Sequence, residues 1–170
     1  RYFLPAPSLR AAITTYYVLD VGGEGLIEEL LFPEWANIRL LLNGEWSQTF
    51  GDGRTVTHPP PMALMSGVIS RTVRVRGAPG RVVGVGFLPA GWAVFTPLRA
   101  RDYVDDIVPL SIFVGPAAES LMRDLIAAPD DAAIVELHAI APSLGQRLGL
   151  DRDAQRLALR DGGGSRPGTG

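Results

Sequence analysis

Short apolar segments, separated by Gly, Pro, Asn and Asp, fill the chain from about residue 12 to 88 and restrict the fold more than any other feature. The segments are AAITTYYVLDV, GLIEELLF, NIRLLLNGEW, TVTHPPPMALMSG, SRTVRVRG and GRVVGVGFL. In RTVRVRG, Val73 and Val75 alternate with polar residues, which is typical of a half-buried strand. The Asn-Gly and Asp-Gly pairs in 43–46 and 51–54 favour hairpin turns, because these residues tolerate positive φ. Repeated short strands at this spacing predict a β-sandwich or a small β-barrel.

The pattern changes after Pro89. Segment 99–110 predicts one or two helical turns that end before its proline. Segments 115–128 and 129–141 each have apolar residues at helical spacing, so together they predict a helical hairpin. The apolar stripe of the first helix consists of Leu121, Met122, Leu125 and Ile126, and that of the second of Ile134, Leu137 and Ile140. The charged and then Gly-rich segment 149–170 is typical of a linker or a disordered tail.

Composition and charge exclude several classes of function. A chain of 170 residues with 46% hydrophobic residues can build one domain with a tail. The formal net charge of -2 gives no overall attraction to phosphates, so this segment is not expected to bind DNA itself. The absence of Cys excludes disulfides, thiolate zinc sites and Cys nucleophiles. Without a signal-peptide pattern or an apolar run of about 18 residues, we expect a cytoplasmic protein with no membrane partner.

The stretch GVGFLPAGW at 84–92 could be a phosphate loop, a strand end or the rim of a pocket. A phosphate loop needs a Gly-rich turn that leads into a helix, whereas Gly84 and Gly86 alternate with Val and Phe in a strand pattern that the next proline ends. A dinucleotide site is therefore not expected. Glycines on one face of a strand leave space above that face. Close packing by Trp92 or Phe95 and a ligand pocket explain that space equally well.

Patterns for catalysis and metal binding are sparse. The chain has two histidines, His58 in THPPP and His138 in a predicted helix, and no carboxylate is spaced with either as in a metal site. There is no GxSxG motif, and Ser66 has no base nearby in the sequence. The adjacent acidic pairs fit solvated positions better than acid–base roles. We therefore expect no catalytic residue, no metal and no cofactor.

Candidates for ligand binding are more numerous. Asn37 and Arg39 share one face of the strand predicted over NIRLLLNGEW. A buried guanidinium needs a partner, so Arg39 is either exposed, the commoner state of Arg, or an anchor inside a barrel. Trp35, Trp46 and Trp92 lie near predicted strand ends, where a ring can line a pocket mouth or belong to the core.

The order of these segments resembles the N-terminal sensor domain of bacterial AraC-type transcriptional regulators, over about residues 2–148. The matching stretches are LPAPSLRAAITTYYVLD, LLFPEWANIRLLLNGEW, LMSGVISRTVRVRGAPGRVVGVGFLPAGWAVF and VDDIVPL before two helices. The specific elements are Pro33 followed by Asn37, the step from Gly67 to Arg71, and GVGFLPAGW, which looks like the family's Gly-Val-x-Phe-x-Pro-Gly-Gly stretch with Ala90 and Trp92 in two places.

The resemblance implies a mainly β fold with some helix. It consists of a cupin-like β-barrel of jelly-roll type over 1–95, a helical segment over 96–148 that packs on the barrel and dimerises, and a linker or tail over 149–170. In the family two helix-turn-helix units follow, so this chain looks like an isolated regulatory fragment or a gene product that lost its DNA-binding domain. The candidates for a ligand pocket are Trp35, Asn37, Arg39, Trp46, Arg71, Phe87 and Trp92, and those for a dimer helix are Leu121, Leu125 and Leu137.

We therefore expect a non-enzymatic domain that binds a small-molecule effector, forms a homodimer and reaches DNA only through the missing C-terminal domain. An effector would favour one arrangement of the helical hairpin over another. One alternative is a small metal-free cupin-type enzyme, an epimerase or isomerase, with a His–carboxylate pair inside the barrel that only His58 could supply. The other is a purely structural dimerisation module, which a packed interior without a drug-sized cavity would favour.

Overall fold

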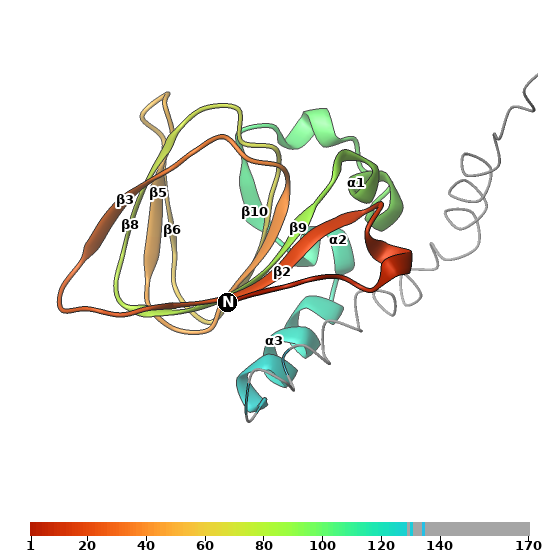
Figure 1. Cartoon of the computed structure of the whole chain (residues 1–170). Coiled ribbons are helices and arrows are strands. Elements are labelled where there is room, and N and C mark those ends of the chain that lie inside the picture. Colours follow the sequence, from red (N-terminus) through yellow and green to blue (C-terminus); the bar gives the residue numbers. More distant parts are fainter. Residues whose placement is uncertain (129, 131–133, 135–170) are drawn as a thin grey trace, which may run out of the picture.

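A computed structural model describes residues 1–128, 130 and 134 and has two antiparallel sheets with a few short helices, so the prediction of a mainly β fold with some helix is confirmed. Sheet A has the order β1 (Tyr2–Phe3), β2 (Ile13–Val21), β9 (Gly80–Phe87), β4 (Asn37–Leu41), β7 (Met62–Ser66) and β10 (Ile107–Pro109). Sheet B has the order β3 (Ile27–Leu31), β8 (Val73–Gly77), β5 (Trp46–Thr49) and β6 (Thr55–His58). In Figure 1 sheet B lies on the left and the helices lie on the right, beyond sheet A.

Local sequence explains the strand pattern and one of the two turns. Along β8, buried Val73 and Val75 alternate with exposed arginines, as RTVRVRG predicts. The Asp-Gly turn joins β5 to β6 as a hairpin, and Gly53 adopts a φ of 85° there. The Asn-Gly turn does not make a hairpin, because β4 belongs to sheet A and β5 to sheet B. Gly44 supplies the positive φ for this turn, but the turn carries the chain from one sheet to the other.

Sheet A is apolar on both faces, which gives the protein two cores. Between the sheets lie Tyr17, Leu41, Phe50, Leu64, Ile69, Val73, Val75, Val82 and Ile107, which we call the intersheet core. On the opposite face of sheet A, the helix-side core includes Tyr16, Val18, Ile38, Leu40, Val83, Val85, Phe87, Trp92, Leu110, Met122 and Leu125. Successive residues of a strand point to opposite faces, so each central strand of sheet A contributes to both cores.

The three α-helices follow β9 and pack on the outer face of sheet A. They are α1 (Pro89–Phe95), α2 (Ser111–Val114) and α3 (Ala117–Ala127). Short 3-10 helices lie at Pro7–Leu9, before β2, and at Ala100–Tyr103. The helix predicted over 115–128 is confirmed as α3. The second helix of the predicted hairpin and the predicted tail lie outside the described residues, except that Ile134 is buried in the helix-side core.

One prediction after residue 88 needs correction. The strand pattern ends before Pro89, where α1 begins directly after β9. The helical turn predicted in 99–110 is present at 100–103, but Ile107–Pro109 forms β10, which pairs with β7 at the edge of sheet A. An edge strand tolerates a proline, because one side of its backbone needs no partner.

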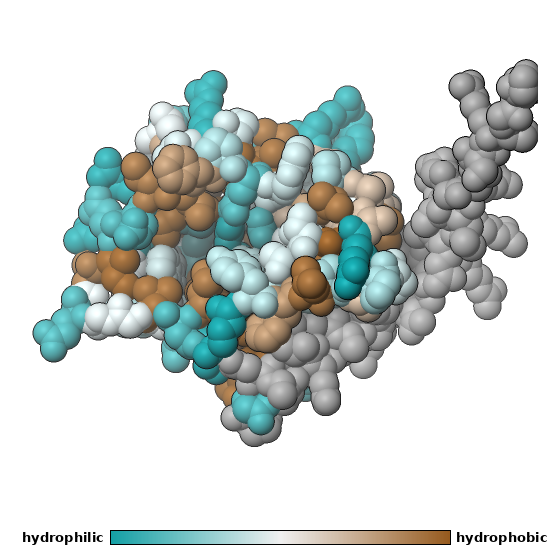
Figure 2. Space-filling view, viewed as in Figure 1, coloured by the Kyte–Doolittle hydropathy of each residue, from teal (hydrophilic) through white to brown (hydrophobic). Residues whose placement is uncertain are grey.

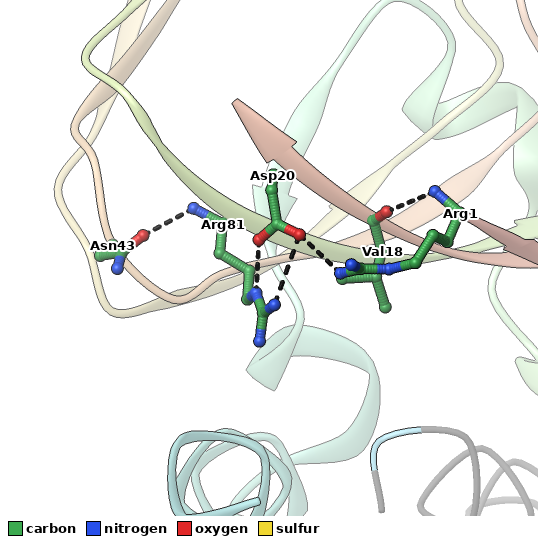
Figure 3. A network of polar contacts seen from close by, with 5 residues as sticks. All are labelled: Arg1, Val18, Asp20, Asn43 and Arg81. Carbon is green, nitrogen blue, oxygen red and sulfur yellow. Dashed lines mark hydrogen bonds and ion pairs between the residues drawn. The ribbon is translucent and has the colours of Figure 1, made fainter. Parts of the chain in front are cut away.

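A surface network connects the N-terminus to β2 and β9 (Figure 3). The Asp20 carboxylate accepts hydrogen bonds from Arg1 Nη2 at 2.5 Å and from Arg81 Nε at 2.6 Å. The backbone amide of Arg81 donates to Asn43 Oδ1 at 2.6 Å, which connects the network to the Asn-Gly turn. The hydrogen bond from Arg81 lowers the pKa of Asp20. The network thus joins four segments of the chain, the N-terminus, β2, the Asn-Gly turn and β9.

Several apolar side chains remain exposed near β3. Figure 2 shows hydrophobic side chains over the left side of the molecule, where β3 lies, with hydrophilic groups around them. Leu26, Leu30 and Phe32 are exposed in this region. No helix within the described residues is long and apolar enough to cross a bilayer.

Candidate functional site

Arg39 lies on the central strand β4 and points into the space between the two sheets. Its side chain is only 14% exposed, so the sequence-based preference for an exposed Arg39 is wrong. Arg39 Nη2 forms an ion pair with Glu34 Oε1, and Asn37 Nδ2 donates to Glu34 Oε2 at 3.2 Å. Glu34 can reach Arg39 because its backbone pairs with Ile69 just before β4 begins. The buried charge therefore has the partner that its burial requires.

Tyr17 reaches Arg39 across a glycine. Gly84 on β9 pairs with Tyr17 on one side and with Arg39 on the other. A Cβ atom at position 84 would overlap the ring of Tyr17, so the ring lies directly over the glycine. The Tyr17 phenol and the Arg39 guanidinium lie close enough for each to change the pKa of the other. The missing side chain at position 84 thus brings together residues from two strands that are not adjacent.

This environment keeps both groups protonated near neutral pH. Burial raises the pKa of Tyr17, while the positive charge of Arg39 acts in the opposite direction. Burial also acts to lower the pKa of Arg39, but the neighbouring Glu34 carboxylate and Tyr17 phenol together outweigh burial, so the pKa of Arg39 is raised. Because neither group exchanges a proton near neutrality, the pair is suited to binding and orienting a ligand.

Two buried donors between the sheets have no acceptor. Arg39 Nη1 and Trp46 Nε1 are both buried and make no hydrogen bond in the part of the chain that the structure describes. A buried donor without an acceptor is costly, and such a group can be satisfied by a ligand. A carboxylate, carbonyl or hydroxyl oxygen could accept from Arg39 Nη1, and Arg39 favours an acceptor that carries negative charge.

The structure separates the seven candidates for a ligand pocket. Asn37, Arg39 and Trp46 lie on the intersheet side, where the Trp46 ring covers Gly77. Phe87 and Trp92 lie in the helix-side core instead, where Trp92 Nε1 donates to the Leu98 carbonyl at 2.6 Å and its ring meets that of Phe113 edge-on. These two aromatic residues support the attachment of the helices.

The other two candidates lie near the surface. Trp35 is 53% exposed and sits in the connection between β3 and β4. Arg71 is exposed and lines an open pocket beside the β5–β6 turn. The space over Gly84 and Gly86 is also not filled as predicted, because Tyr17 and Thr14 occupy it rather than Trp92 or Phe95. No pocket is therefore needed to explain these two glycines.

His58 is buried between the sheets and pairs with an amide. Its Nε2 lies 3.2 Å from Gln48 Oε1, and burial lowers the pKa of the imidazole. The His–carboxylate pair that would favour a cupin-type enzyme is not formed at His58, whose hydrogen-bond partner among the described residues is Gln48. Within the same residues, no group of three His, Asp or Glu side chains could hold a metal ion.

The candidates for a dimer helix have different environments. Leu125 is 2% exposed and belongs to the helix-side core, so the core of a single chain explains its apolar character. Leu121 is partly buried against the same core. Leu137 lies outside the described residues. On α3, the neighbouring Ile126 is 55% exposed.

Sequence reasoning missed Tyr17 and Glu34, the two partners of Arg39. The sequence carried a partial signal in the alternating glycines of β9, since a glycine opposite a large side chain leaves room for it. Which large side chain fills that room depends on the pairing of β2 with β9. Searches of protein-family models and of curated proteins find no match for this chain.

Proposed function

We propose that this chain is the regulatory domain of an AraC-type transcriptional regulator. In this proposal a cupin-like barrel of jelly-roll type binds a small-molecule effector, forms a homodimer and biases a DNA-binding domain outside this chain. The single observation that carries the proposal is buried Arg39, whose Nη1 lacks an acceptor among the described residues while its other contacts hold it in place. A fixed, desolvated cation with an open donor is a suitable anchor for a polar effector.

The two cores provide a route from effector to helices. Arg39 faces the intersheet core, whereas its neighbours Ile38 and Leu40 pack in the helix-side core. A ligand that moves Arg39 therefore changes the position of β4 on both of its faces. Because packed cores favour discrete arrangements, such a shift would bias one arrangement of the helices over another.

The test is a ligand screen followed by a measurement of assembly. Small carboxylates, sugars and amino acids are added to the purified chain, and the melting temperature and Trp fluorescence are recorded. A hit should be lost in Arg39→Gln and kept in Arg76→Gln, a change of an exposed arginine on β8. Sedimentation with and without the hit should show a dimer whose stability changes. The proposal fails if no compound shifts the melting temperature and the chain is a monomer.

A purely structural dimerisation module is the second candidate. The apolar intersheet core, which contains Phe50, Leu64 and Val73, favours it because these side chains occupy space that a ligand would need. A dimer with no response to any compound would support this candidate. A metal-free epimerase or isomerase is the remaining alternative, and turnover of a sugar or amino acid in the same screen would support it.

A further inference from the structure

An open pocket of about 150 Å³ lies where sheet B meets the segment that leads into β10. Three stretches of chain form it, and its lining residues are Phe50, Gly51, Asp52, Arg71, Val73 and Asp105. Phe50 and Val73 are buried members of the intersheet core and supply the apolar part of the lining. Asp52, Arg71 and Asp105 supply the charged part. The pocket thus offers both apolar and polar contact.

The two carboxylates that line the pocket already have donors. Asp105 Oδ1 accepts from the Ser70 amide and Asp105 Oδ2 from Ser70 Oγ, both at 2.6 Å. Asp52 Oδ1 accepts from the Arg54 amide at 2.9 Å. These bonds stabilise the charged carboxylates, and the pKa of Asp105 is lowered mainly by Ser70. Both carboxylates therefore already accept hydrogen bonds from the protein itself.

Arg54 is also engaged. Its Nη1 donates to Asp106 Oδ1 at 2.8 Å and its Nη2 to the Asp105 carbonyl at 2.7 Å. The guanidinium carbon lies 4.3 Å from the centre of the Phe50 ring. These contacts connect the β5–β6 turn of sheet B to the segment before β10 of sheet A. Arg54 thus joins two of the segments that line the pocket.

Arg71 differs from these neighbours. Its guanidinium makes no hydrogen bond or ion pair with any residue that the structure describes, although its charge contributes to lowering the pKa of Asp105. Its Cδ lies 3.9 Å from the place where a Cβ at position 51 would be, so the side chain runs beside Gly51 at the pocket. An arginine with open donors binds a carboxylate through two parallel hydrogen bonds.

We propose that this pocket binds a small organic monocarboxylate, with the carboxylate on Arg71 and the apolar part against Phe50 and Val73. A volume of about 150 Å³ fits a molecule of about the size of a benzene ring. This site is separate from the Arg39 site, because it uses a different cation and opens at the surface. A ligand there bridges the β5–β6 turn and the segment before β10, so it reinforces the contact that Arg54 makes between the sheets.

The experiment is an NMR titration of the full chain with sodium benzoate, using benzamide as a neutral molecule of the same shape. We expect benzoate to shift the amide signals of Gly51 and Gly53 with a roughly millimolar affinity, as is reasonable for a ligand of this size. Benzamide should bind at least tenfold more weakly. Both ligands are compared at one ionic strength, because salt weakens surface charge interactions.

Three variants localise the binding. Arg71→Gln should weaken benzoate binding at least tenfold, and Gly51→Leu should do the same by placing a side chain in the pocket. The backbone at Gly51 accepts a Cβ, since its nearest neighbour would be 3.9 Å away. Arg76→Gln removes an exposed arginine from the same strand and should change the affinity less than twofold. The unshifted remainder of each spectrum verifies that the variant is folded.

Specific outcomes overturn the proposal. Equal binding of benzoate and benzamide would show that Arg71 does not select the charge. An unchanged affinity in both Arg71→Gln and Gly51→Leu, or shifts centred on Arg39 instead of Gly51, would place the ligand elsewhere. The Arg39 screen succeeds or fails independently of these results, because Arg71→Gln leaves the interior between the sheets intact.

Discussion

The ring of Tyr17 lies over Gly84, and this contact brings the phenol to Arg39 on the next strand. Gly84→Ala places a methyl group inside the ring, so Tyr17 must swing out of the intersheet core. We expect a loss of about 1 to 3 kcal/mol in the free energy of unfolding, as for other overpacked cores. Urea unfolding followed by Trp fluorescence measures it.

The cause is tested with a second substitution. In a Tyr17→Leu background the penalty of Gly84→Ala should shrink, because the ring that causes the overlap is gone. Gly51→Ala is the matched control and should stay within about 0.5 kcal/mol of the parent, since a Cβ there meets only an ordinary contact. Equal penalties of Gly84→Ala in both backgrounds would refute the role of Tyr17.

The Arg39–Glu34 pair should behave as a buried ion pair. Arg39→Met leaves a carboxylate without its cation, and Glu34→Met does the reverse. Each should cost on the order of 3 kcal/mol, whereas the double substitution should cost clearly less than their sum. Urea unfolding of the two single variants and the double variant measures the coupling.

An exposed pair on sheet B is the control. Arg74 Nη1 lies 2.6 Å from Glu28 Oε1, but the two side chains are 62% and 50% exposed. The corresponding methionine variants should change stability by less than about 1 kcal/mol. If both cycles give the same small coupling, the interior between the sheets is more hydrated than the burial of Arg39 indicates.

Stability should fall in mild acid because of His58. Burial lowers its pKa in the folded chain below the usual value of 6.5, so the unfolded chain binds the proton more readily. The contribution of neutral His58 to the free energy of unfolding is therefore fully present above about pH 6.5. This contribution decreases as the pH drops from there towards the folded pKa, with a slope of up to about 1.4 kcal/mol per pH unit.

Comparison with a variant isolates this group. Urea unfolding at pH 7.5 and at a series of values down to 5 is repeated with His58→Asn. The difference in the free energy of unfolding between the parent and His58→Asn should decrease towards lower pH. His138 is present in both proteins, so its effect cancels in this difference. A pH-independent difference would mean that His58 can be protonated without loss of its buried contacts.

Adjacent residues on α3 should respond differently to a charge. Leu125→Asp puts an unpaired carboxylate into the helix-side core and should cost more than about 3 kcal/mol, enough to unfold a marginal domain. Ile126→Asp changes an exposed position and should leave the fold intact. Circular dichroism detects the fold, and sedimentation of Ile126→Asp then reports whether this face of α3 contributes to a dimer.

Sequence reasoning predicted the strands well but not their partners. The alternation in RTVRVRG indicated which face of β8 is buried, because period two is a property of the extended backbone itself. The Asp-Gly turn was assigned correctly as a hairpin, whereas the Asn-Gly turn was not. Both pairs allow positive φ, and nothing local distinguishes a turn within a sheet from a passage between sheets.

The candidate site was predicted only in part for the same reason. Arg39 was recognised as a residue that needs a partner if it is buried, but its burial and its contacts with Glu34 and Tyr17 could not be inferred. Burial of Arg39 depends on sheet B covering sheet A, and contact with Tyr17 depends on a register that runs through Gly84. Neither is encoded within a short window of sequence.

The sequence by itself determined where the chain extends, where it turns and which residues of each strand are apolar, because side-chain periodicity and turn chemistry act over a few neighbouring residues. Only the tertiary structure decided that residues 17, 39 and 84 lie in one row across sheet A. It also decided that Trp92, on α1, packs in the helix-side core, away from the interior between the sheets. The pairing of distant strands and the packing of sheet A on both faces produce these contacts, and they result from long-range burial of apolar surface.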